Sequence, residues 1–153
     1  MSPPAFVAQD PDFERRVRDS FGRQQAMVLL GAQMERVAPG EVEILLPYSP
    51  RIGQQHGFVH GGMIGAVLDT ACGFASLTLM PADAGVLTVE YKVNFLAPGI
   101  GERFRMIGRV RKAGRTITLA EADAFSQRDG REKLVATMTA TMMTITGRDD
   151  VRS

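Results

Sequence analysis

A single carboxylate stands in the middle of a long apolar segment. In residues 54–81, QQHGFVHGGMIGAVLDTACGFASLTLMP, Asp69 is the only acidic or basic residue between His60 and Asp83. Burying an unpaired carboxylate costs several kcal/mol, or else raises its pKa until the group is neutral. Two interpretations are open. Asp69 is either a hydrogen-bonded or surface aspartate of a helix, or a general base or nucleophile.

Two glycines precede this segment, directly after His60. Gly61 and Gly62 leave backbone N–H groups uncovered at the positive end of the helix that they open, where a developing oxyanion would be stabilised. The alternative is a simple turn before the helix. The glycines together with Asp69 favour a catalytic interpretation over either feature alone.

The spacing of these groups has a consequence for assembly. Eight residues of helix separate Gly61 from Asp69, a distance of about 12 Å. A base must lie within hydrogen-bond reach of the reacting group, directly or through one water. One helix therefore cannot bring its own start and its own middle together, whereas two antiparallel copies related by a two-fold axis can. We expect a homodimer with composite sites, each using Gly61 of one chain and Asp69 of the other.

The surrounding pattern indicates the elements that hold these groups. Residues 61–80 are apolar on nearly all sides and end before Pro81, which predicts a buried helix. Residues 32–48 predict a hairpin around Pro39-Gly40. Alternation of apolar and polar residues then predicts four strands, at 88–97, 103–113, 116–128 and 133–146. One or two short helices are expected near the N-terminus, with Asp10 as the N-cap.

This order predicts an α+β fold in which a curved antiparallel sheet wraps around a long central helix, with an extra N-terminal helix. One face of the third strand segment carries only small residues, which would let the helix approach closely; they are Ala120, Ala122 and Ala124. We expect a flexible lead-in at 1–12, a single domain at 13–146 and a frayed tail at 147–153.

Composition excludes several classes of function. The chain has 153 residues, 44% of them hydrophobic and 23% charged, with a formal net charge of +1, so neither a nucleic-acid nor an anionic-membrane partner is indicated. The single cysteine, Cys72, favours a reducing compartment and is expected to be a packed core residue. Neither a secretory signal nor a membrane span is visible, so a cytoplasmic location is expected.

The sequence HGFVHGGMIGAVLDTACG resembles the His-Gly-Gly-x6-Asp signature of the PaaI-like hotdog-fold acyl-CoA thioesterases, and GVLTVEYKVNFLAPG resembles their following strand. The likeness extends over about residues 30–146. It implies dimers that often pair into tetramers, and hydrolysis of an acyl-CoA thioester. It also implies no metal and no cofactor, coenzyme A entering only as part of the substrate.

The resemblance also implies roles for individual residues. The Gly61 amide would polarise the thioester carbonyl, and Asp69 would activate water or attack the carbonyl directly. His60 would shape the helix start, and Thr88 would help to hold the nucleophilic water. Gln54 stands where better-known members have Asn, six residues before the histidine; its longer amide arm would contact the carbonyl or the water.

Further residues are candidates for binding substrate. Gly62 offers a second amide at the helix start, and His56 and Phe58 lie in the preceding loop. For the phosphates of coenzyme A the candidates are Arg111, Lys112 and Arg115, which could equally be solvated surface charges. An acyl pocket capped by the N-terminal helix is expected from residues that could also be plain core: Phe21, Met27, Phe58, Met63 and Phe74.

Two other functions are compatible with the same residues. One is a hydratase or dehydratase acting on acyl thioesters, with His60 recruited as acid or base. The other is an acyl-CoA-binding module without catalysis. The glycine pair and the retained Asp69 favour hydrolysis over both.

Overall fold

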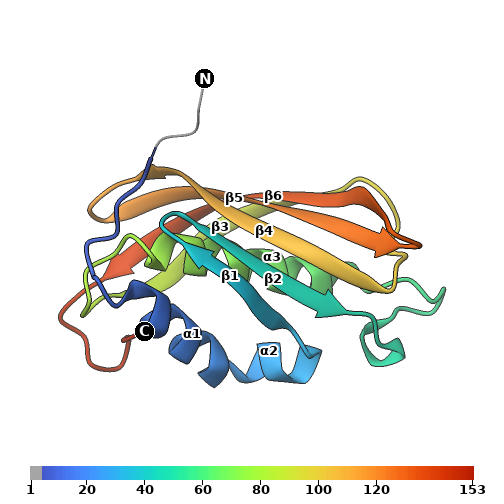
Figure 1. Cartoon of the computed structure of the whole chain (residues 1–153), viewed down its shortest axis with the longest axis horizontal. Coiled ribbons are helices and arrows are strands. Elements are labelled where there is room, and N and C mark those ends of the chain that lie inside the picture. The colour runs from blue at the N-terminus through green and yellow to red at the C-terminus, as the bar shows by residue number, and fades with distance from the viewer. Residues whose placement is uncertain (1–4) are drawn as a thin grey trace.

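One antiparallel sheet of six strands curves around helix α3, and two short helices lie below its edge (Figure 1). The computed structural model describes residues 5–153. The sheet has the strand order β1-β2-β4-β5-β6-β3. The elements are α1 (Phe13–Arg23), α2 (Gln25–Leu30), β1 (Gln33–Ala38), β2 (Glu41–Pro47), a short 3-10 turn (Pro50–Ile52), α3 (Gly61–Leu77), β3 (Gly85–Phe95), β4 (Arg103–Ala113), β5 (Ile117–Arg128) and β6 (Arg131–Ile145). The predicted α+β class and element order are confirmed.

Small residues let α3 lie directly against the middle of the sheet. Gly108 of β4 pairs with Ala122 of β5. A Cβ atom at Gly108 would lie only 2.3 Å from the carbonyl oxygen of Ala71 in α3. The alanines at 120, 122 and 124 are buried here as well, so the predicted small-residue face is the one that receives the helix.

Helix α3 ends three residues earlier than the sequence predicted. Thr78 follows its last residue, and the Thr78 hydroxyl donates to the Ala75 carbonyl at 2.6 Å. The same hydroxyl accepts a hydrogen bond from the Gly40 amide at 2.8 Å. This contact ties the end of α3 to the β1–β2 turn, so a hydroxyl between helix and hairpin stops the helix before Pro81 does.

The N-terminal segment is held to the end of α3 by one buried arginine. Arg16 of α1 donates to the carbonyls of Leu77 and Met80 at 3.1 and 3.0 Å, and its Nε lies 3.2 Å from an oxygen of Asp10. The prediction that Asp10 is the N-cap of α1 is therefore wrong. Asp12 occupies that position, because the Asp10 carboxylate is turned toward Arg16 and accepts from the Asp12 amide.

The two chain ends make more contacts than a flexible lead-in and a frayed tail would. Phe6 packs over Gly40, and Gln9 donates to the Leu79 carbonyl at 2.8 Å; residues 1–4 lie outside the described residues. In the tail, the Val151 backbone packs against Gly85 at the start of β3. The tail is therefore packed, because a glycine there leaves room for its backbone. The domain boundaries themselves stay a prediction.

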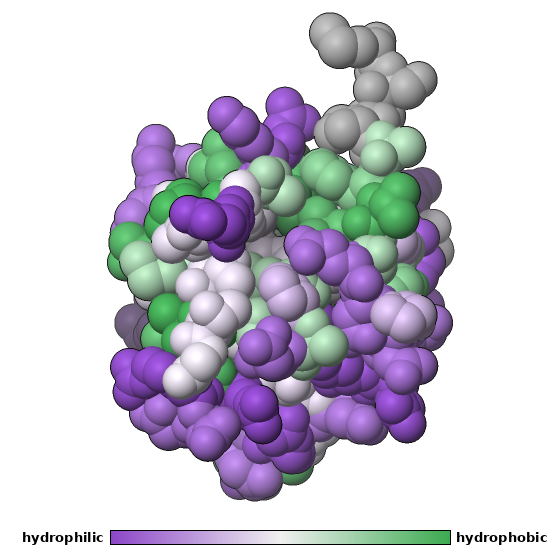
Figure 2. Space-filling model, turned by 90° about the vertical axis from the view of Figure 1, so that its left-hand side faces the viewer, coloured by the Kyte–Doolittle hydropathy of each residue, from purple (hydrophilic) through white to green (hydrophobic). Residues whose placement is uncertain are grey.

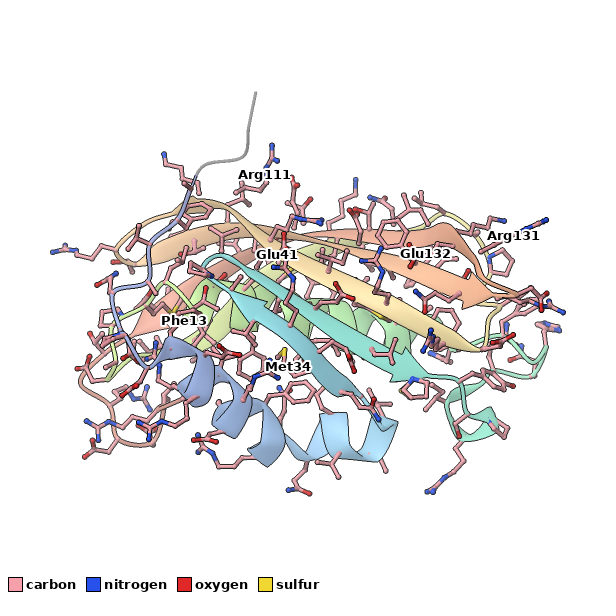
Figure 3. All side chains as sticks on the ribbon, viewed as in Figure 1. Phe13, Met34, Glu41, Arg111, Arg131 and Glu132 are labelled. Atoms are coloured by element: carbon pink, nitrogen blue, oxygen red, sulfur yellow. The ribbon has the colours of Figure 1, made fainter. Side chains whose placement is uncertain are left out.

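The outer face of the sheet carries ion pairs and not a core. Figure 3 shows Glu41, Glu132 and Arg111 on the side of the sheet away from α3. Arg105 of β4 forms ion pairs with Glu132 at 2.7 Å and with Glu43 at 3.5 Å. The hydrogen bond from Arg105 lowers the pKa of Glu132 to about 2. Among residues 5–153, no helix has the length and apolarity needed to cross a membrane.

Candidate active site

The Asp69 carboxylate lies half-buried at the middle of α3 and faces the start of β3. Its Oδ1 accepts a hydrogen bond of 2.7 Å from the Thr88 hydroxyl. Burial raises the pKa of Asp69 above its ordinary value, and the hydrogen bond from Thr88 partly opposes that shift. The carboxylate is therefore more basic than an exposed aspartate, yet its ionised form has a donor.

A β-bulge aims Thr88 at this carboxylate. The register of β3 against β6 shifts between Thr88 and Glu90, so that Thr88 pairs with the buried Met142 whereas Glu90 pairs with Thr141 on the other face. Strict alternation would place Thr88 on the face of Glu90. The extra residue, Val89, re-aims the strand, which is a common use of bulges beside functional sites.

A cavity of about 240 Å³ opens beside Asp69 and Thr88. Its walls come from α3, from β3, from the last residues of α1 and from the linker to α2. The α1 and linker residues are Ser20, Arg23 and Gln24, and Ser153 of the tail also reaches the cavity. The sequence reasoning considered only the apolar face of α1 and missed these three. The available signal was Gly22, because a glycine weakens the interior of a helix and so indicates a break between two short helices.

The start of α3 has the form expected of an anion site. His60 is the N-cap, and its Nδ1 accepts a hydrogen bond of 2.9 Å from the Gly62 amide. The Gly61 amide donates to no residue among 5–153. A free amide thus lies at the positive end of the 17-residue helix. The Phe95 ring covers the α-carbon of Gly61, since a Cβ there would lie 3.0 Å from the ring.

Within one chain the two halves of the expected site stay apart. Gly61 is the first residue of α3 and Asp69 its ninth, so about 12 Å of helix axis separates them. The structure brings Asp69 and Thr88 together at the middle of α3. A second group, at the start of α3, consists of His60, Gly61 and Gly62.

The loop before α3 is held by its own hydrogen bonds. The side-chain oxygen of Gln54 accepts from the His56 amide, and the Gln54 backbone bonds to Phe58 and Gly57. The His56 ring is exposed and lies 6.2 Å from the Phe58 ring, centroid to centroid. Gln54 therefore shapes the turn that carries His56 and Phe58 toward the helix start.

The cations nominated for coenzyme A lie at the opposite end of the sheet from Gly61. Arg111, Lys112 and Arg115 are exposed at the end of β4 and in the β4–β5 turn, whereas α3 begins near the β5–β6 turn (Figure 1). Arg111 lies 3.5 Å from Glu121 on the outer face. Hydrophilic side chains cover much of the end of the molecule that carries the β4–β5 turn (Figure 2).

Most residues proposed for an apolar pocket are core. Phe21 and Phe74 pack edge to face with ring centroids 5.9 Å apart, and Met27 is fully covered. Met63 and Phe58 are only partly buried. Phe74 does line the Asp69 cavity. Cys72 is buried, and burial raises the pKa of its thiol, as expected of a packed cysteine.

The geometry is matched by known proteins. The profile of the thioesterase superfamily matches residues 56–133, which span the α3 start, Asp69, Thr88 and the central strands. The chain belongs to the thioesterase superfamily. The thioesterase is 52% identical to a thioesterase family protein from Silicibacter pomeroyi, whose crystal structure superposes with a TM-score of 0.87; the match covers 88% of this chain and 99% of that one.

Two further relatives extend the comparison. The medium/long-chain acyl-CoA thioesterase YigI of Escherichia coli is 26% identical over 129 residues, covering 74% of this chain and 81% of YigI. The PaaI protein of the E. coli phenylacetic acid degradation operon is 18% identical and superposes with a TM-score of 0.80, covering 89% of this chain and 95% of PaaI. PaaI shares the fold. The predicted hotdog fold and the resemblance to PaaI-like thioesterases are confirmed, and the chain is a thioester hydrolase.

Proposed function

We propose that this thioesterase hydrolyses acyl-CoA thioesters at composite sites, with Asp69 of one chain and the Gly61 amide of a second chain. The observation that carries the proposal is the Asp69–Thr88 pair, 2.7 Å apart beside a cavity in the middle of α3. YigI, which acts on medium- and long-chain acyl-CoA by its name, supports the substrate class.

The outer edge of β3 supports the second chain. Tyr91 and Phe95 pair across the sheet with Ala140 and Ala136, which are fully buried beneath α3. Cross-strand partners share a face of the sheet. Tyr91 and Phe95 are nevertheless 46% and 52% exposed, because β3 is the last strand of the sheet and no strand among residues 5–153 lies beyond it. An apolar edge strand left open in this way favours pairing with another copy.

Antiparallel pairing of two such edges would complete the site. In one chain the Gly61 end of α3 lies near the β5–β6 turn, and the far end of α3 lies near the β4–β5 turn (Figure 1). A two-fold axis at β3 reverses the partner, so its Gly61 approaches the half of α3 where the first chain holds Asp69. That end of the first chain carries its own β4–β5 turn, so the partner's Gly61 comes near Arg111, Lys112 and Arg115 of the first chain, where we place the coenzyme A phosphates. Pairing of two dimers stays a prediction.

The chemistry needs only groups that these chains provide. Thr88 donates to Oδ1 of Asp69, which leaves Oδ2 free to accept a proton from a water that the Thr88 oxygen also holds. The water oxygen bonds to the thioester carbon, and the carbonyl oxygen takes up negative charge at the Gly61 amide. The carbon–sulfur bond then breaks, and the proton held by Asp69 passes to the departing sulfur. Direct attack by Asp69 is the alternative route.

The rival functions gain no observation of their own. The Nδ1 atom of His60 is engaged with the Gly62 amide, which suits a positioning role better than that of a hydratase base. Participation of Gln54 is less direct than expected, because its side-chain oxygen is bonded to the His56 amide. The absence of a metal or cofactor and the cytoplasmic location stay predictions.

The test is free-thiol release from a panel of acyl-CoA substrates, together with hydration of an enoyl-CoA. Asp69→Asn keeps an oxygen that accepts from Thr88 but cannot take a proton, so kcat for hydrolysis should fall about 10²–10⁴-fold while the fold is retained. Near-normal thiol release by this variant would refute the assignment. Hydration without thiol release would identify a hydratase, and binding without turnover in the parent protein would identify a binding module.

A further inference from the structure

The cavity beside Asp69 has polar lining residues in addition to the catalytic pair. Besides Asp69 and Thr88, it is lined by the hydroxyls of Ser20 and Thr70 and by the carboxamide of Gln24. A pocket for an alkyl chain is lined predominantly by apolar side chains. Gly73, Phe74 and Val86 supply only part of this lining. Resting on the proposed function, we infer that this cavity receives the acyl group, and that the preferred acyl group is short and ends in a carboxylate bound by Arg23.

The cavity has room for a short acyl group. Its volume is about 240 Å³, and a group of about eight non-hydrogen atoms fits within it, such as a five-carbon dicarboxylic acyl group. The cavity is partly open, so a longer alkyl chain would extend past its polar lining toward solvent. We therefore expect a shorter preferred acyl group than the name of YigI describes.

The break between α1 and α2 gives the lining its polar character. Gln24 is extended, with φ −78° and ψ 98°, and connects the two helices. Its side-chain oxygen lies 3.4 Å from the Thr70 hydroxyl, next to Asp69 on α3. The NH₂ group of Gln24 donates to no residue among 5–153 and can bind a ligand oxygen. The direction of the Gln24 side chain therefore depends on this non-helical connection between α1 and α2.

Arg23 is the only cation among the described residues that line this cavity. Its Nε is 3.4 Å from the Asp19 carbonyl of its own helix, and it forms no ion pair within residues 5–153. The two terminal nitrogens are therefore available, and they match the two oxygens of a carboxylate. An acyl group held by its thioester at Asp69 and by a terminal carboxylate at Arg23 would be fixed at both ends.

The experiment compares kcat/KM for three substrates: glutaryl-CoA, pentanoyl-CoA of equal carbon count, and dodecanoyl-CoA. We expect the parent protein to prefer glutaryl-CoA over pentanoyl-CoA by about tenfold, the range of one charge-assisted contact. Arg23→Met should lower kcat/KM for glutaryl-CoA about tenfold more than for pentanoyl-CoA and so remove the preference, and Arg23→Lys should retain part of it. Arg15→Met is the matched control, because Arg15 is an exposed arginine of the same helix that does not line the cavity.

The outcomes separate this inference from the proposed function. Turnover that favours pentanoyl-CoA or dodecanoyl-CoA, or an unchanged preference in Arg23→Met, would overturn the inference and leave the proposed function standing. An equal loss on all three substrates in Arg23→Met would show that Arg23 contacts coenzyme A, and would also overturn it. No turnover of any acyl-CoA by the parent protein would overturn both.

Discussion

The Gly61 amide can be deleted with little other change to the backbone. Gly61 is the first residue of α3, a position where proline is favoured because the N–H has no partner within the helix. His60 before it is extended, with φ −61° and ψ 132°, as a residue preceding proline prefers. Gly61→Pro should therefore fold and lack the one donor assigned to the oxyanion. Gly61→Ala is the matched control, since it adds the same Cβ against Phe95 and keeps the amide.

The expected effect follows from the role of the amide. Removing one oxyanion donor lowers kcat by about 10²–10³, or about 2.7–4 kcal/mol. The alanine control adds a Cβ at 3.0 Å from the Phe95 ring. At this distance the ring has to shift by only a few tenths of an ångström, so we expect the control to lose less than about tenfold in kcat. The ratio of the two variants isolates the amide from the steric effect.

The assay is free-thiol release by each variant, followed by mixing of Gly61→Pro and Asp69→Asn proteins under conditions of subunit exchange. In a mixed dimer one site receives both defects and the other receives neither. At equal amounts half of the dimers are mixed, so about a quarter of all sites should be intact and activity should return to about that fraction of the parent value.

Two results would refute the reasoning. Equal kcat for Gly61→Pro and Gly61→Ala would show that the amide stabilises no developing charge. Absence of recovery in a mixture whose chains are shown to exchange would place Gly61 and Asp69 in one chain, and the composite site would be wrong.

Three further predictions concern the carboxylate, the core and the edge. Because burial raises the pKa of Asp69, the folded state favours the protonated acid. As pH increases from the ordinary pKa of aspartate to the raised pKa of Asp69 in the folded protein, the free energy of unfolding should therefore fall and kcat should rise. Asp69→Asn should abolish both trends and raise Tm at pH 7. An unchanged pH profile in Asp69→Asn would contradict this. Gly108→Ala places a Cβ 2.3 Å from a carbonyl of α3 and should lower the free energy of unfolding by about 1–3 kcal/mol in denaturant titration. Its control Gly22→Ala, in an open helical position, should raise it by about 0.5–1 kcal/mol, and equal effects would refute the close approach. Tyr91→Asp should give monomers in sedimentation velocity and abolish thiol release. The control Ile117→Asp, at a side chain that is equally exposed at 46%, should leave the dimer intact. A dimeric and active Tyr91→Asp protein would exclude the β3 edge as the dimer interface.

Local patterns were sufficient for most of the fold. An Asp-Gly pair such as Asp129-Gly130 is typical of a two-residue hairpin turn, and both residues take the positive φ that such a turn needs, at 51° and 71°. The run of apolar residues after His60 predicted a buried helix because no face of it could remain in water. The same pattern distinguishes Asp69, since a carboxylate in such a helix needs a partner or a function.

Contacts between distant residues were beyond such patterns. The Thr78 hydroxyl that ends α3 depends on a hairpin 38 residues away. Ser20, Arg23 and Gln24 reach the cavity because α1 packs against the far end of α3, which no periodicity reveals. Whether Gly61 and Asp69 of two chains meet is likewise a matter of assembly.

By itself, therefore, the order of residues determined which segments would be helix, strand and turn, and which side chains carry reactive groups. The direction in which those groups point was decided by the folded chain. Alternation places Thr88 on the outer face with Glu90, yet the bulge at Val89 turns its hydroxyl to within 2.7 Å of Asp69. The physical reason is that one extra residue in a strand shifts its register against a neighbour more than 50 positions away, and that shift is set by the packing of the whole sheet.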